Sequence, residues 1–190
     1  MNRVRWSVIL LVAATLPWAG CVPDRQIFRS GPFSGKVIDA VTERPLEGAV
    51  VLVVWERDFA TVGAGHSAQK FLDAEEVLTD QNGEFNVPAR THWAVYGMVP
   101  SPSITIYYPG YGAFPDFQVS PTIGARALPA GEYTTVELRR ARTFDERRLF
   151  GGGIPTPGVV PKAKMPNLLR LLNDERRAMG LPPISTTEDK

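Results

Sequence analysis

The sequence predicts an all-β protein built as an antiparallel β-sandwich, and three observations support this. Its 190 residues include 17 glycines and 17 prolines, a composition that favours many turns over long helices. About six or seven short apolar runs alternate with turn residues, the spacing typical of a sandwich. No such run precedes a segment with the period of a crossover helix, so a parallel α/β sheet is not expected.

The stretch 34–55 supplies the first two expected strands. Residues 35–39 form a short apolar run, and the polar connection after them contains Pro45 and Gly48, which are typical turn residues. Residues 49–55 form a β-branched run, rich enough in apolar side chains to be buried on both faces. Val50 is therefore expected to face the core.

Further strands are expected near residues 76–79, 84–88, 104–108 and 132–138, with a short additional one at 114–119. Asn82-Gly83 lies between the first two and favours a hairpin, because both residues tolerate positive φ. Phe85 and Val87 alternate with polar neighbours, as in a half-buried strand. We expect Phe85 and Ile106 to face the core, and residues 90–103 to form a long connection.

The N-terminus carries the features of an export signal. Arg3 and Arg5 precede an apolar stretch, residues 6–16, that is too short to span a bilayer comfortably. Ala19-Gly20 then precede Cys21, the only cysteine. This segment resembles a bacterial lipoprotein signal, in which residues 1–20 are removed and Cys21 is lipidated. An ordinary signal peptide with an incidental cysteine, or an uncleaved anchor, are the alternatives.

The resemblance to lipoproteins also implies a location. In that family an aspartate directly after the cysteine is associated with the inner membrane, and here the following residue is Val22. The resemblance therefore implies a cell-envelope protein anchored to lipid, facing the periplasm from the outer membrane. Residues 21–32, with mixed charge, glycine and proline, are expected to form a tether.

Four motifs of the body occur in a characteristic order. They are GKVID at 35–39, PLEGAV at 45–50, TDQNGEF at 79–85 and PGY at 109–111. In this order they resemble the carboxypeptidase regulatory-like family, whose fold is a transthyretin-like β-sandwich, here over residues 33–140. The resemblance implies a non-catalytic module that aids folding, stability or binding.

The C-terminal part, residues 141–190, is expected to be a linker followed by one helix. The charged residues 139–148 indicate a solvated strand end, or alternatively a basic patch for anionic lipid. Residues 166–179 place Leu168, Leu172 and Met179 on one side of a helix. This stripe either packs back on the sandwich or binds an envelope protein partner, so these three residues are candidate partner-binding residues.

The sequence contains no recognisable catalytic arrangement. His66 and His92 are the only histidines and lack a second ligand at metal-binding spacing, so we expect no zinc. The segment 80–83 begins like a calcium loop but lacks its closing glutamate. A net charge of +1 gives no reason to expect nucleic acid. We therefore expect no enzyme activity, metal or cofactor.

Trp93 and Tyr96 are the candidate ligand-binding residues. Together with other aromatic residues they could form a platform for sugar, or they could belong to the core or cover a sheet edge. Two functions follow from the sequence. The chain is either a structural or protein-interaction lipoprotein, or a binding module that holds carbohydrate or peptide with its inter-strand loops.

Overall fold

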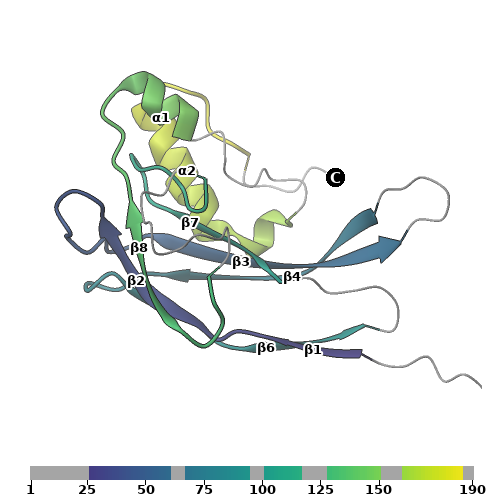
Figure 1. Cartoon of the computed structure of the whole chain (residues 1–190). Helices are drawn as coiled ribbons and strands as arrows, with labels where there is room; N and C mark the ends of the chain where they lie inside the picture. Colours follow the sequence, from purple (N-terminus) through teal and green to yellow (C-terminus); the bar gives the residue numbers. More distant parts are fainter. Residues whose placement is uncertain (1–25, 61–66, 95–100, 117–127, 151–159, 186–190) are drawn as a thin grey trace, which may run out of the picture.

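The computed structural model describes residues 26–60, 67–94, 101–116, 128–150 and 160–185 (Figure 1). In these ranges the chain is mainly β-strand, arranged in antiparallel and mixed sheets with two short α-helices. The prediction of a mostly β protein is therefore confirmed.

Eight strands form three sheets in the described residues. The strands are β1 (Gln26–Ser30), β2 (Phe33–Asp39), β3 (Val50–Ala60), β4 (Ser67–Leu78), β5 (Glu84–Val87), β6 (Arg90–Ala94), β7 (Ser103–Tyr107) and β8 (Tyr133–Leu138). The orders are β5-β2-β8 and β4-β3-β7 in the larger sheets, and β1-β6 in a two-stranded sheet.

The sheet β5-β2-β8 is mixed, because β2 and β8 run parallel from Ser34↔Tyr133 to Asp39↔Leu138. The prediction of a purely antiparallel arrangement is therefore wrong at this pair. Only a tight turn forces neighbouring strands to be antiparallel. The long stretch of chain between β2 and β8 imposes no such constraint.

One apolar core lies between the two larger sheets. Val37, Phe85 and Val136 come from β2, β5 and β8, and they belong to the same buried cluster as Val53 and Ile106 from β3 and β7. The opposite face of β3, with Val50 among its residues, belongs to a second cluster. Residues 50–55 of β3 are thus buried on both faces, as predicted, and Val50, Phe85 and Ile106 are themselves buried.

The turn at Asn82-Gly83 forms, but it does not close a hairpin. Gly83 has a φ of 74°, and its carbonyl accepts a hydrogen bond of 2.8 Å from Val37 N of β2. Strand β4 pairs with β3, whereas β5 pairs with β2. The turn therefore carries the chain from one sheet to the other, and the hairpin prediction is wrong because partners elsewhere in the chain outcompete the local pairing.

Two segments expected to lack strands pair with each other. Strand β1 lies in the predicted tether and β6 in the predicted connection, and they are antiparallel from Gln26↔Ala94 to Ser30↔Arg90. Each segment is short and has weak alternation, so its strand character depends on a partner distant in the sequence. The tether prediction is thus wrong for residues 26–30, while residues 21–25 lie outside the described residues. Phe114 forms only an isolated bridge with Ile106, and residues 117–119 are also outside them.

The C-terminal part contains α1 (Phe144–Phe150), the 3-10 helix η2 (Lys162–Lys164) and α2 (Pro166–Ala178). The helix predicted at 166–179 is confirmed, whereas α1 corrects the expectation of a linker at 144–150. A carboxylate from β4 caps the N-terminus of α2. Glu76 accepts hydrogen bonds from Asn167 N at 2.9 Å and Leu168 N at 2.6 Å. These bonds satisfy amide groups that have no partner within the helix.

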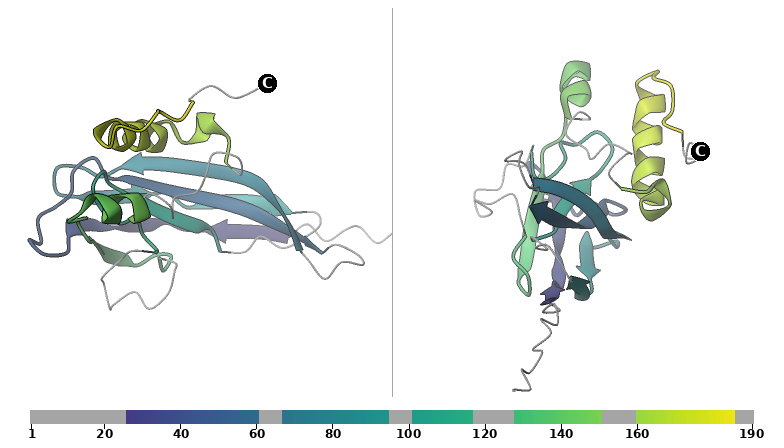
Figure 2. Two further views of the ribbon diagram at one scale, coloured as in Figure 1. Left: turned by 90° about the horizontal axis from the view of Figure 1, so that it is seen from above. Right: turned by 90° about the vertical axis from the view of Figure 1, so that its right-hand side faces the viewer.

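Helix α2 covers the outer face of the sheet β4-β3-β7 (Figure 2). Leu168 and Leu172 are 0% and 8% exposed and belong to the same buried cluster as Leu52 of β3. The apolar stripe therefore packs on the sheet, the first of the two predicted alternatives. Leu168 and Leu172 are corrected as partner-binding candidates because no partner can reach them, and Met179 is half-buried.

Candidate functional site

A groove with a volume of about 560 Å³ runs along β1. It is lined by residues 27–30 of β1, Phe33 of β2, His92 of β6, Ser101 and Pro102 before β7, and residues 128–130 before β8. We call it the β1 groove. It brings together segments that are up to about a hundred positions apart in the sequence.

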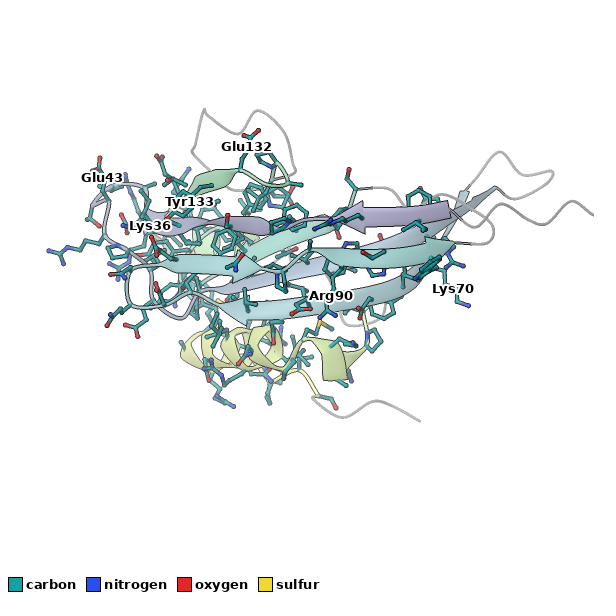
Figure 3. All side chains as sticks on the ribbon, turned by 90° about the horizontal axis from the view of Figure 1, so that it is seen from below. Lys36, Glu43, Lys70, Arg90, Glu132 and Tyr133 are labelled. Carbon is teal, nitrogen blue, oxygen red and sulfur yellow. The ribbon has the colours of Figure 1, made fainter. Side chains whose placement is uncertain are left out.

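The groove follows an open edge of β1. Successive side chains of a strand point to opposite faces, so four consecutive residues line one groove most readily along the strand's edge. Among the described residues, β1 has β6 as its only strand partner. Figure 3 shows β1 at the outer margin of the molecule, with β6 beside it.

The groove combines apolar walls with one cation. Phe28, Phe33 and Leu128 contribute apolar surface, and Ser30 contributes a hydroxyl group. The side chain of Arg29 is exposed and makes no ion pair with any described residue. This lining suits an extended, partly apolar ligand that also carries a negative charge.

His92 is the buried polar group of the groove. It is 9% exposed, and its ring centroid lies 5.1 Å from that of Trp55 at a tilt of 44°. Burial lowers the pKa of His92 below its ordinary value, an effect that Asp73 opposes and Arg90 reinforces. The imidazole is therefore neutral at pH 7. His92 Nε2 and Trp55 Nε1 have no hydrogen-bond partner in the part of the chain that the structure describes, which costs about 1–3 kcal/mol for each buried group.

Trp93, a predicted ligand-binding residue, lies outside the lining of the groove. It is 57% exposed and pairs across the ribbon with Ile27, which is 59% exposed. Its carbonyl accepts a hydrogen bond of 2.9 Å from Arg57 Nη2. Tyr96, the other predicted residue, lies outside the described residues. The structure therefore places His92, not its neighbour Trp93, in the groove.

The sequence does not indicate Arg29 and Phe28 as site residues, because the composition of residues 21–32 predicts a tether. The segment QIFRS at 26–30 contains a β-branched and an aromatic residue, which is a weak strand signal. No local pattern connects it to His92 on β6. The groove exists only because the two short strands pair.

The far end of the molecule carries a second, more polar site around Arg140. Two hollows, of about 360 and 540 Å³, both include this residue. Asp39 lines the larger one and accepts hydrogen bonds of 2.8 Å from Val41 N, Thr42 N and Tyr111 Oη. Burial alone would raise the pKa of Asp39, but these bonds outweigh it and lower the pKa. Asp39 therefore stabilises the loop after β2 through these hydrogen bonds. The β1 groove is the stronger candidate site.

In the described ranges, no three histidine, cysteine or acidic side chains are grouped so as to hold a metal ion. None of the described helices has the length and apolar character needed to cross a bilayer. Cys21, the predicted lipidation site, lies outside these ranges.

No protein-family model, curated protein or solved structure matches this chain.

Proposed function

We propose that this chain is a membrane-tethered, non-catalytic lipoprotein of the bacterial cell envelope that acts as a structural or protein-interaction module. Its lipid is carried by Cys21, and its body faces the periplasm from the outer membrane. The observation that carries the proposal is the position of β1. Only residues 22–25 separate Cys21 from Gln26, and β6 holds β1 to the rest of the chain.

This short connection has a geometric consequence. Five residue steps lead from Cys21 to Gln26, and a fully extended chain covers at most about 18 Å in that distance. An acylated Cys21 would hold the β1 groove close to the bilayer. The loops around Arg140, at the other end of the body, would then face away from the membrane.

For the body, we propose a transthyretin-like β-sandwich. The support is that the sheets β5-β2-β8 and β4-β3-β7 contribute to one buried cluster, together with the order of the four motifs between residues 35 and 111. An experimental structure in which Val37 and Val53 lie in separate cores would contradict this fold.

Membrane fractionation tests the tether. The unmodified chain is expected in the membrane fraction, with acyl groups on the N-terminal cysteine by mass spectrometry. Cys21→Ser is expected to leave the membrane, and Arg25→Gln is a matched control that should stay. If the Cys21→Ser chain stays with the membrane, the lipid tether is wrong.

The β1 groove is the proposed interaction surface. The stripe of α2, which the sequence suggested for this role, is occupied by the sheet. The described lining of the groove has one histidine and no carboxylate. This lining suits binding better than acid–base hydrolysis, because hydrolysis of that kind usually requires two acidic side chains.

Carbohydrate binding through Trp93 is a second candidate function. The observation in its favour is the large exposed area of this indole, since sugars stack on exposed aromatic rings. After removal of residues 1–20 only Trp55 and Trp93 remain, and Trp55 is buried. Peptidoglycan fragments should shift the fluorescence of the mature chain, and Trp93→Ala should abolish the shift. An unchanged spectrum would exclude this role for Trp93.

A further inference from the structure

We propose that the β1 groove binds an extended peptide segment of a partner protein as an additional strand beside β1, with an acidic side chain of the peptide facing Arg29. The inference rests on the proposed role of the chain as an interaction module, and it specifies the partner's chemistry.

The backbone of β1 supplies the first part of the argument. A strand with a neighbour on one side presents a row of unpaired N–H and C=O groups on the other. Among the described residues, β1 has β6 on one side only, and the groove of about 560 Å³ lies along the strand. An extended peptide fits such an edge by adding a strand, and its main-chain hydrogen bonds supply affinity independently of its sequence.

The apolar lining supplies the second part. Phe28, Phe33 and Leu128 line the groove without filling it. A peptide strand sends alternate side chains to one face, so alternate apolar residues would meet this surface. This favours a partner segment with β-branched residues at every second position.

Arg29 supplies the third part of the argument, because a cation in the groove favours a partner segment with a negative charge. On the same ribbon, Arg90 forms an ion pair with Glu75, so its guanidinium already has a carboxylate. Arg29 has no such partner among the described residues, although it lines the groove. A guanidinium binds a carboxylate through two parallel hydrogen bonds, so an aspartate or glutamate in the peptide completes the site.

His92 also lines the groove, but it pairs with Phe28, so its side chain lies on the face of the ribbon opposite to that of Arg29. The Nε2 atom of His92 is buried and has no hydrogen-bond partner among the described residues. Recognition of the peptide therefore rests on the strand edge, the apolar lining and Arg29.

Peptide binding to the full mature chain, in detergent micelles, tests the proposal. The probe is a fluorescein-labelled peptide of sequence Val-Thr-Val-Asp-Val-Thr with an amidated C-terminus, followed by anisotropy. Saturable binding of one peptide per chain is expected. Arg29→Gln should weaken it about tenfold, the effect of losing one charge-assisted contact. Arg140→Gln, at the other end of the body, is the matched control and should leave binding unchanged.

Two altered peptides distinguish the contribution of main-chain hydrogen bonds from the contribution of the peptide's negative charge. Methylation of alternate peptide nitrogens removes the donors of a strand and should abolish binding. Replacing Asp by Asn should weaken binding to the unmodified chain but not to Arg29→Gln. Equal binding of the methylated peptide would overturn strand addition, and equal losses on both chains would overturn the role of Arg29.

Hydrogen exchange keeps the test decisive if Arg29→Gln folds poorly. In the unmodified chain, amides of residues 27–30 should exchange more slowly when the peptide is added. Unchanged exchange, or pairing of two copies through β1 in place of peptide binding, would overturn the proposal. Mass spectrometry of Cys21 on the same sample distinguishes this failure from failure of the tether, because acylation does not depend on the groove.

Discussion

Arg147 of α1 donates two hydrogen bonds of 2.7 Å, from Nε and Nη2, to the carboxylate of Glu175 in α2. The carboxylate side chain is 7% exposed and the arginine side chain 34% exposed, so this pair is shielded from water mainly on the α2 side. The hydrogen bonds from Arg147 to Glu175 raise the pKa of this arginine. The pair connects the charged segment after β8 to the helix that covers the sheet.

Arg147→Met should destabilise the protein by about 3 kcal/mol, because it leaves the buried carboxylate of Glu175 without a partner. The lower end of the range for buried pairs applies, since Arg147 is partly exposed. Urea unfolding at pH 7 measures the change. The double variant Arg147→Met/Glu175→Leu should recover at least half of the loss. Simple addition of the two single losses would show that the pair is not coupled.

Gly83→Ala should cost much more stability than Gly48→Ala. Both glycines have positive φ, 74° and 76°, so both substitutions carry the backbone strain of about 1–2 kcal/mol. At Gly83 a Cβ would also lie 2.5 Å from Val37 O, whereas nothing lies within 4 Å of a Cβ at Gly48. Thermal unfolding of the two variants compares the losses. Equal losses would mean that the turn does not sit against β2.

Leu168→Ala should destabilise the protein by about 2–5 kcal/mol, the usual cost of a cavity in a packed core. The leucine is fully buried in the cluster between α2 and β3. Met179→Ala is the matched control from the same predicted stripe, and it should cost less because Met179 is only half-buried. Urea titration of both variants tests the assignment. A loss below about 1 kcal/mol for Leu168→Ala would indicate that α2 does not cover the sheet.

The parts of the fold that the sequence could predict are those determined by strong local patterns. The β-branched run that became β3, the alternation around Phe85 and the apolar stripe of α2 each carry enough buried surface to specify their own structure. The positive φ at Gly83 was likewise predictable from its turn. Which strand pairs with which was not predictable, because β4 and β5 find better partners in β3 and β2 than in each other.

The groove was beyond prediction for the same physical reason. Arg29 and His92 lie on strands of five residues whose pairing depends on a partner more than sixty positions away in the sequence. Neither segment has an apolar pattern strong enough to indicate burial by itself. Its residue type makes Trp93 a candidate from sequence alone, yet on this strand Trp93 is exposed and its neighbour His92 is buried.

Stability should fall as the pH drops through about 6.5, the ordinary pKa of histidine in an unfolded chain, and His92 should account for part of this change. Burial lowers the pKa of His92 in the folded chain, so the unfolded chain binds more protons in this range. The contribution of His92 to stability is therefore complete above the unfolded pKa and is lost as the pH falls toward the folded one. The pKa values of Asp39 and Asp73 are lowered from 3.8, so these groups act at lower pH. The urea midpoint should depend less steeply on pH for His92→Phe than for the unmodified chain. His66→Gln is the control, and its pH dependence should match that of the unmodified chain because His92 is still present. Parallel slopes for His92→Phe and the unmodified chain would contradict a buried, neutral His92 in the groove.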